Sequence, residues 1–110
     1  MAGPDPVVGL ALAIIADRAR CRPLDRATIA AHVGVSSSTL AHRLKKLTGS
    51  STAEHINRAR VNSAKQLLHK TDLPIKAIAV DVGFRRSSDL SYWFRRLQGI
   101  TPSAFRRVAP

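Results

Sequence analysis

The feature that most constrains the fold is an internal repeat, because a stretch in the first half of the chain recurs in the second. The segment "VGVSSSTLAHRLKKLTGSS" (residues 33–51) returns as "VGFRRSSDLSYWFRRLQGITP" (residues 82–102), with one residue inserted near the turn. The matching positions are Ile29, Ala30, Val33 and Gly34 with Ile78, Ala79, Val82 and Gly83, and Leu40, Leu44, Leu47 and Gly49 with Leu90, Phe94, Leu97 and Gly99. Such self-similarity indicates that one small structural unit has been duplicated.

Each copy has the pattern of a short helix, a tight turn and a longer helix. A glycine follows each expected short helix (26–33 and 75–82), where it supplies the left-handed conformation that closes a helix. The longer helices are expected at 37–47 and 87–97. A small core is expected in the first copy from Ile29, Val33, Leu40 and Leu44, with Val35 as an apolar plug in the turn and Phe84 in its place in the second copy. This pattern is typical of a helix–turn–helix.

Capping residues predict where the other helices begin. Asp5-Pro6 starts a helix that reaches about residue 20, and Ser51 with Glu54 forms a capping box for a long helix over about 52–69. Asp25 and Ser36 are the expected caps of the two helices between them, Pro74 the expected first residue of the next, and Thr101-Pro102 the start of the last. The apolar face of the long helix would comprise Ala53, Ile56, Val61, Ala64, Leu67 and Leu68.

The sequence predicts an all-α fold of about seven helices, since no segment has the period-two alternation of a half-buried strand. Two homeodomain-like helix–turn–helix subdomains would be joined by a long linker helix. The expected order is an N-terminal apolar helix packed on the first subdomain (1–22), the first helix–turn–helix (23–50) and the linker helix (51–70). The second helix–turn–helix with a C-terminal helix would follow (71–110).

Charge limits the classes of partner. Eighteen Lys and Arg face seven Asp and Glu, which gives a net charge of +11. A polyanion is therefore the expected partner, and nucleic acid ranks above a membrane surface. Cys21 is the only cysteine, so no disulfide framework or CxxC metal site can form, and we expect a small, partly buried residue in a reducing cytoplasm. The apolar run 7–16 is too short to span a bilayer, and no basic leader precedes it.

The outer face of the longer helix in each copy is the candidate interface with DNA, because a helix–turn–helix presents that face to the major groove. Its residues are Ser37, Ser38, Ala41, His42 and Lys45 in the first copy, and Arg86, Ser87, Ser88, Ser91, Tyr92 and Arg95 in the second. Contacts with phosphates are expected from Ser37, Lys45, Lys46, Arg85, Arg86, Arg95 and Arg96. A linker of eighteen residues would span roughly 27 Å, comparable with the distance of about 34 Å between successive major-groove faces.

Some residues keep a second interpretation. Ser38 can face solvent or a base, Arg60 can form an internal ion pair, and Trp93 is expected in the core or as half-buried support. His32, His55 and His69 lack metal-ligand spacing, so no metal site is expected. The apolar helix 7–16 can cover the first helix–turn–helix or dock a sensor domain or second subunit.

The chain resembles the DNA-binding domain of the AraC/XylS family of bacterial transcription regulators over residues 23–107. The resemblance is carried by "IAAHVGVSSSTLAHRLKKLTGSS", "RARVNSAKQLLHKTDLPIKAIAVDVGF" and "LSYWFRRLQGITPSAFRR". It implies two helix–turn–helix units that read two adjacent major-groove segments. It also implies base contacts from Ser38, Ala41 and His42 in the first unit, and from Ser87, Ser88, Ser91 and Tyr92 in the second. Leu97-Gln98 departs from the family's usual aromatic pair, and Tyr92 stands where Arg is frequent.

The resemblance further implies an activator that binds promoter or operator DNA, contacts RNA polymerase and works without a cofactor. Family members commonly carry a further domain that senses a small molecule such as a sugar, and the early apolar helix is similar to that of members of the xylose-regulator type. The rival hypotheses are a basic helical adaptor for an acidic protein and a fragment of a DNA-repair methyltransferase with Cys21 as acceptor. No carboxylate pair, phosphate loop or nucleophile elbow favours an enzyme.

Overall fold

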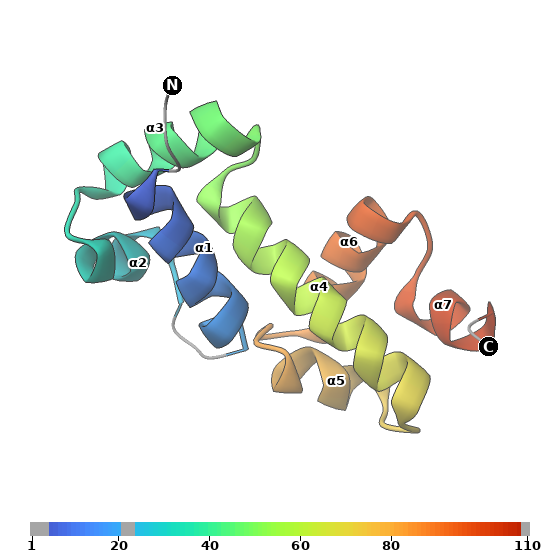
Figure 1. Cartoon of the computed structure of the whole chain (residues 1–110). Coiled ribbons are helices and arrows are strands. Elements are labelled where there is room, and N and C mark those ends of the chain that lie inside the picture. The colour runs from blue at the N-terminus through green and yellow to red at the C-terminus, as the bar shows by residue number, and fades with distance from the viewer. Residues whose placement is uncertain (1–4, 21–23, 109–110) are drawn as a thin grey trace. The chain divides into compact units, whose positions relative to one another are not determined.

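The computed structural model describes residues 5–20 and 24–108, and within them it has seven α-helices and no strand (Figure 1). The helices are α1 (Pro6–Arg18), α2 (Arg26–Val33), α3 (Ser37–Thr48), α4 (Thr52–Lys70), α5 (Ile75–Asp81), α6 (Ser87–Gln98) and α7 (Pro102–Val108). The predicted all-α class is confirmed, whereas the expectation for Cys21 lies outside the described residues. No helix in the described part of the chain is long and apolar enough to cross a membrane.

The chain divides into two compact units, Met1–Ile56 and Asn57–Pro110. The division falls inside α4, which runs as one continuous helix of 19 residues (Figure 1). Each unit contains one copy of the repeat: α2 and α3 in the first, α5 and α6 in the second.

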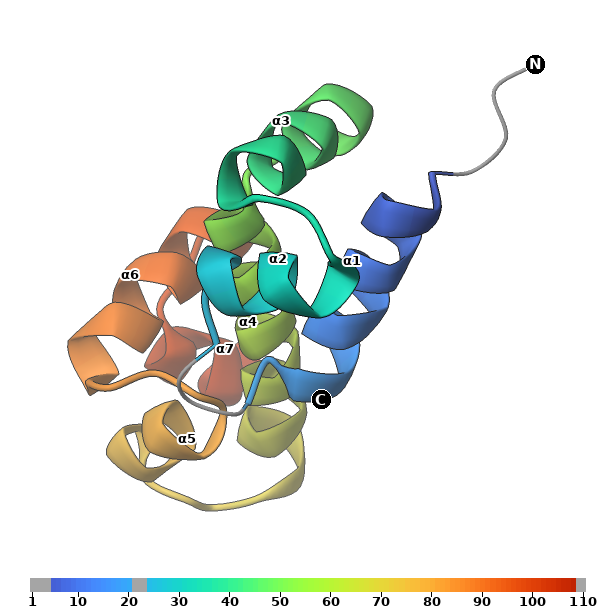
Figure 2. The same cartoon turned by 90° about the vertical axis from the view of Figure 1, so that its left-hand side faces the viewer.

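The first unit is a small helical cluster in which α1 packs on α2 and α3, and α2 packs on α3 (Figure 2). Its buried side chains are Val8, Ala11, Ile15, Ala19, Ile29, Ala30, Leu40, Leu44 and Ile56. Leu40 and Leu44 are fully buried, and the burial of each such side chain is worth about 1.5–3 kcal/mol. Val33 and Val35, expected in this core, are only partly buried, so α1 rather than the turn supplies much of the apolar cover.

The second unit has its own core between α4, α5, α6 and α7. The fully or nearly fully buried residues are Val61, Ala64, Leu68, Ile78, Ala79, Val82, Phe84, Leu90 and Phe94. Phe84 takes the expected place of an apolar plug, with the Arg60 guanidinium 5.7 Å from its ring centre. Arg106 ties α7 to the end of α4, because its side chain donates hydrogen bonds to the backbone oxygens of Leu68 (3.3 Å) and Thr71 (3.2 Å).

The expected caps are present. The Asp5 carboxylate accepts from the Val7 and Val8 amides at 2.9 and 3.3 Å. Asp25 accepts from Thr28 N (2.8 Å), and Ser36 from Thr39 N (3.1 Å). The capping box joins Glu54 N to Ser51 Oγ (3.1 Å) and Ser51 N to Glu54 Oε1 (3.5 Å).

The turn glycines also behave as predicted. Gly34 has φ 79° and Gly83 has φ 110°, in the left-handed region where a Cβ is costly. The amide after each glycine donates back into the short helix, from Val35 to Ala30 O (3.1 Å) and from Phe84 to Ala79 O (2.9 Å). The two copies therefore form the same turn.

Two local predictions were wrong. Ala53 is exposed and Thr52 is buried at 3% exposure, because the buried side of α4 begins one residue earlier than the apolar pattern indicated. Pro74 precedes α5 instead of beginning it, because its ψ of 149° is extended; its oxygen accepts the first helical bond from Ile78 N at 3.0 Å.

Candidate nucleic-acid interface

The exposed face of α3 is set by the two leucines that anchor the helix. Leu40 and Leu44 lie one helical turn apart and are fully buried, so the opposite side of α3 must face outward. On that side Ser38, His42, Lys45 and Lys46 are exposed, while Ser37 and Ala41 are partly buried. The structure therefore places all six predicted contact residues of the first unit on one helix, with short polar, imidazole and ammonium groups side by side.

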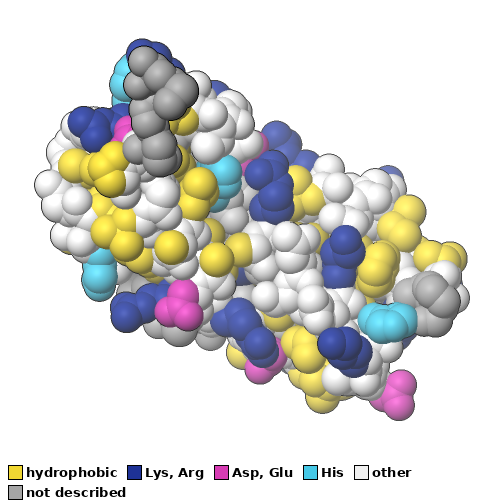
Figure 3. Space-filling model, viewed as in Figure 1, with side chains coloured by type: hydrophobic (Ala, Val, Ile, Leu, Met, Phe, Trp, Pro, Cys, Tyr) yellow, Lys and Arg dark blue, Asp and Glu magenta, His cyan; other side chains and the backbone are white. Residues whose placement is uncertain are grey.

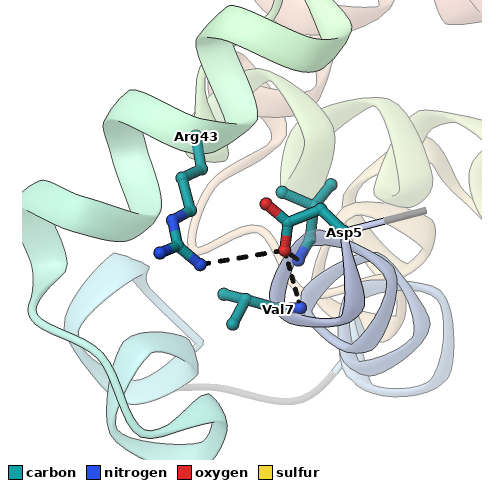
Figure 4. Close-up of polar contacts among 4 residues, drawn as sticks. Asp5, Val7 and Arg43 are labelled. Carbon is teal, nitrogen blue, oxygen red and sulfur yellow. Dashed lines mark hydrogen bonds and ion pairs between the residues drawn. The ribbon is translucent and has the colours of Figure 1, made fainter. Parts of the chain in front are cut away.

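A contact that the sequence did not reveal joins α3 to the start of α1. Arg43 Nη1 lies 3.8 Å from Asp5 Oδ1, the oxygen that also caps α1 (Figure 4). The two side chains are 44% and 21% exposed. An ion pair of this exposure contributes about 0–1 kcal/mol to the free energy of unfolding. It is therefore a weak contact between one side of α3 and the N-terminus of α1.

The exposed face of α6 is built in the same way. Leu90 and Phe94 are fully buried. The predicted contact residues lie on the other sides of the helix or just before it: Ser88, Tyr92, Arg95, Arg96, Arg85 and Arg86 are exposed, and Ser87 and Ser91 are partly buried. Arg86 stands where Ser36 caps α3 but makes no capping bond; its Nε lies 3.8 Å from Asp89.

Five of these residues share a shallow hollow of about 760 Å³, lined by Ser88, Ser91, Tyr92, Arg95, Arg96 and Thr101. Thr101 was not among the predicted contacts, although the Thr-Pro start of the last helix marked its position. Its hydroxyl caps α7 by accepting from Ala104 N at 3.1 Å. Hydroxyls and two guanidinium groups around an open hollow can donate to phosphate oxygens and to base edges.

Two aromatic rings lie beside Arg96, and one of them, that of Tyr92, lines the hollow. Its Nη1 donates to Tyr92 Oη at 3.4 Å, and its guanidinium carbon lies 5.6 Å from the Trp93 ring centre. The Tyr92 and Trp93 rings meet edge to face, with centres 5.5 Å apart and an angle of 87°. Trp93 is partly buried and packs against the core, as expected.

Positive charge is spread over the surface. Lys and Arg side chains outnumber Asp and Glu on the face drawn in Figure 3, in keeping with the net charge of +11. No group of three or more His, Cys, Asp or Glu within residues 5–20 and 24–108 could hold a metal ion. The face drawn in Figure 3 is thus mainly basic and polar around its apolar patches.

Comparison with known proteins identifies the family. Residues 29–108 match the model of a helix-turn-helix domain. The chain belongs to the AraC-type helix-turn-helix family. The chain is 35% identical over 103 residues to a putative AraC-like transcription regulator of Streptomyces antibioticus. The matched region covers 94% of this chain and 34% of the relative. The AraC-type domain thus spans about a third of the length of such relatives.

Solved structures agree with this assignment. The C-terminal domain of AraT, a response regulator from Geobacillus stearothermophilus, superposes with a TM-score of 0.89 at 28% identity, covering 96% of this chain and 88% of that domain. The DNA-binding domain of AdpA, solved in complex with a target DNA, has a TM-score of 0.80 at 30% identity, covering 94% and 92%. This chain is an AraC-type DNA-binding domain of the kind found in transcription regulators.

Proposed function

We propose that the chain binds specific double-stranded DNA sequences by placing α3 and α6 in two adjacent major-groove segments. The observation that carries the proposal is the pair of matched helices whose buried leucine or phenylalanine residues leave a polar, basic face outward. The AdpA domain, with a similar fold, was solved on a target DNA. Lys and Arg would supply affinity through displaced counterions, and the outward side chains would supply sequence preference.

The proposed roles follow the chemistry of each side chain and the resemblance to the AraC/XylS family. Base contacts are assigned to Ser38, Ala41 and His42 on α3, and to Ser87, Ser88, Ser91 and Tyr92 on α6. Phosphate contacts are assigned to Ser37, Lys45, Lys46, Arg85, Arg86, Arg95 and Arg96. Exposed basic groups are suited to phosphates, and hydroxyl, imidazole and phenol groups can donate to or accept from base edges.

The length of α4 supports the proposal that one chain contacts two major-groove segments. Its 19 residues span about 28 Å at 1.5 Å per residue, close to the separation of about 34 Å between successive major-groove faces. We propose that a single chain thereby contacts two half-sites, as a two-fold dimer of simpler helix–turn–helix proteins does.

We further propose that the chain is the DNA-binding part of a bacterial transcription activator that works in the cytoplasm by binding alone, without a cofactor or a chemical step. The relatives are about three times as long as the region that matches. A domain that senses a small molecule such as a sugar, and a contact with RNA polymerase, would belong to the complete regulator.

Selection of bound duplexes from a random pool tests this function. The chain should enrich a motif with two half-sites about one helical turn apart, and His42→Ala should relax preference at one half-site by about 1–3 kcal/mol per lost contact. Ser103→Ala, at an exposed position outside both reading faces, should leave the motif unchanged. Enrichment of no motif, together with an acidic protein partner that duplex DNA fails to displace, would instead support a basic adaptor.

A further inference from the structure

We propose that Arg96 reads a guanine in the major groove and that Tyr92 positions it. The inference rests on the proposed function and deepens it, because it assigns Arg96 to a base instead of a phosphate and gives the Tyr92 hydroxyl a partner within the protein. The evidence is the set of contacts that hold the Arg96 guanidinium on two sides.

The guanidinium is held by one hydrogen bond and one ring. Nη1 donates to Tyr92 Oη at 3.4 Å, and the guanidinium carbon lies 5.6 Å from the Trp93 ring centre, within the range of a cation–π contact. Trp93 is fixed in turn, because it packs against the core of the second unit and meets Tyr92 edge to face. The guanidinium is therefore oriented by Trp93, which packs on the core, and by Tyr92, which is 58% exposed and contacts Trp93.

These contacts also place the charge away from the end of the helix. Arg96 lies near the C-terminal end of α6, where a freely extended side chain would suit a phosphate. Side chains on a helix lean toward its N-terminus, and the bond to Tyr92, four residues earlier, draws the guanidinium one turn back. Arg96 there lines the same hollow as Ser88, Ser91 and Tyr92, together with Arg95 and Thr101.

The fixed guanidinium keeps the donors that guanine recognition needs. Arginine carries five N–H donors in a planar fork, and the bond to Tyr92 occupies only one. A fork oriented before binding loses less conformational entropy per hydrogen bond, and the N7 and O6 atoms of guanine match it in a bidentate arrangement. Arginine can also bind phosphate in a bidentate arrangement, but a phosphate accepts from a wider range of directions than the edge of a single base, so a fixed orientation matters more for guanine.

The first unit lacks this arrangement. The residues of α3 that match Tyr92, Trp93 and Arg96 in the repeat are His42, Arg43 and Lys46. The first unit has neither a tyrosine nor a tryptophan at these positions, Lys46 carries an ammonium group instead of a planar fork, and Arg43 lies near Asp5. The guanine preference is thus expected from the half-site of α6 alone.

The test uses the whole chain and the duplex selected from a random pool, with each base pair of the α6 half-site varied in turn. Arg96→Lys keeps the charge but removes the fork, so preference for guanine at one base pair should fall by about 5- to 150-fold. Affinity for duplexes that already carry another base there, and the dependence of binding on salt, should change little. Arg107→Lys, the same change at an exposed position of α7 outside the assigned contacts, is the matched control and should leave every preference as in the wild type.

Tyr92→Phe separates positioning from direct reading. It keeps the ring that packs on Trp93 and removes only the hydroxyl, so part of the same guanine preference should be lost. In the Arg96→Lys background, Tyr92→Phe should cause no further loss, because Tyr92 acts through Arg96. Loss of preference at a different base pair would show that the Tyr92 hydroxyl reads DNA itself and would overturn the assignment.

A phosphate role gives the opposite result. If Arg96→Lys preserves every preference, and Arg96→Gln weakens all duplexes equally while the slope of log K against log salt falls by about 0.9, the guanine assignment is wrong and the proposed function stands. A wild-type chain that enriches no motif would overturn the proposed function itself. Circular dichroism melts of each variant establish that these changes occur in a folded protein.

Discussion

Thr52, at the first position of α4, is buried at 3% exposure, and its hydroxyl has no hydrogen-bond partner within residues 5–20 and 24–108. A buried hydroxyl without a partner costs about 1–3 kcal/mol. Valine has nearly the same shape and no polar atom. We therefore expect Thr52→Val to raise the free energy of unfolding by about 1–3 kcal/mol, and the melting temperature by about 4 °C or more for a domain of this size.

The repeat provides an independent variant for the same position. Ser51-Thr52 matches Thr101-Pro102, and Pro102 is fully buried at the first position of α7. The first amide of a helix has no intrahelical acceptor, so proline there removes no hydrogen bond and its φ is already suitable. Thr52→Pro should therefore also stabilise the fold.

Chemical and thermal denaturation followed by circular dichroism measure the effect. Thr71→Val is the matched control, because the Thr71 hydroxyl donates to Leu67 O at 2.7 Å and accepts from Leu73 N at 3.3 Å. Its loss should lower stability by about 1 kcal/mol. If Thr52→Val lowered stability as Thr71→Val does, the Thr52 hydroxyl would have a partner in solution and the reasoning would be refuted.

Three further predictions concern charge. Lys45→Gln should reduce the slope of log K against log salt by about 0.9, the effect of one lost phosphate contact; an unchanged slope in filter-binding titrations would remove Lys45 from the interface. Hydrogen bonds from the Thr28 backbone amide and hydroxyl lower the pKa of Asp25 in the folded chain. The ionised Asp25 carboxylate therefore stabilises the fold fully above the pKa that Asp25 has in the unfolded chain. This stabilisation is lost as the pH falls through the lower pKa of the folded state. The stability of Asp25→Asn should lack this loss on acidification. Acid unfolding transitions that are identical in the wild type and in Asp25→Asn would contradict the prediction. Asp5→Ala should destabilise the fold by about 1 kcal/mol, because the cap of α1 is lost. Asp5→Asn keeps the cap and should lose only the weak ion pair with Arg43. Equal melting temperatures for the two variants would contradict a capping role.

Local sequence signals were sufficient for most of the fold. The glycines at 34 and 83 and the capping residues act within a few positions along the chain, and the repeat shows where the same pattern recurs. Together they identify helices and turns without tertiary information. It was harder to predict which side chains at the start of α4 face the core. Thr52 and Ala53 are both small, and only the packing of Ile56 and its neighbours determines which of the two turns inward.

Contacts between distant elements could not be predicted from sequence patterns. Arg106 donates to carbonyls at the end of α4, and Arg43 pairs with Asp5, but nothing in the local sequence separates these arginines from those on the reading faces. Helical periodicity identified the outward positions of α6. It did not give the side-chain conformation that brings Arg96 against Tyr92 and Trp93, because that depends on rotamers and on the core beneath Trp93.

The most direct test of the central claim is the affinity of the chain for its selected duplex when five base pairs are inserted between the two half-sites. Half a helical turn moves the second half-site to the opposite side of the DNA. If one chain reads both half-sites through α3 and α6, affinity should fall to that of a duplex with a single half-site, with one chain bound to the original duplex. Unchanged affinity after the insertion, or two chains on the original duplex, would contradict the account.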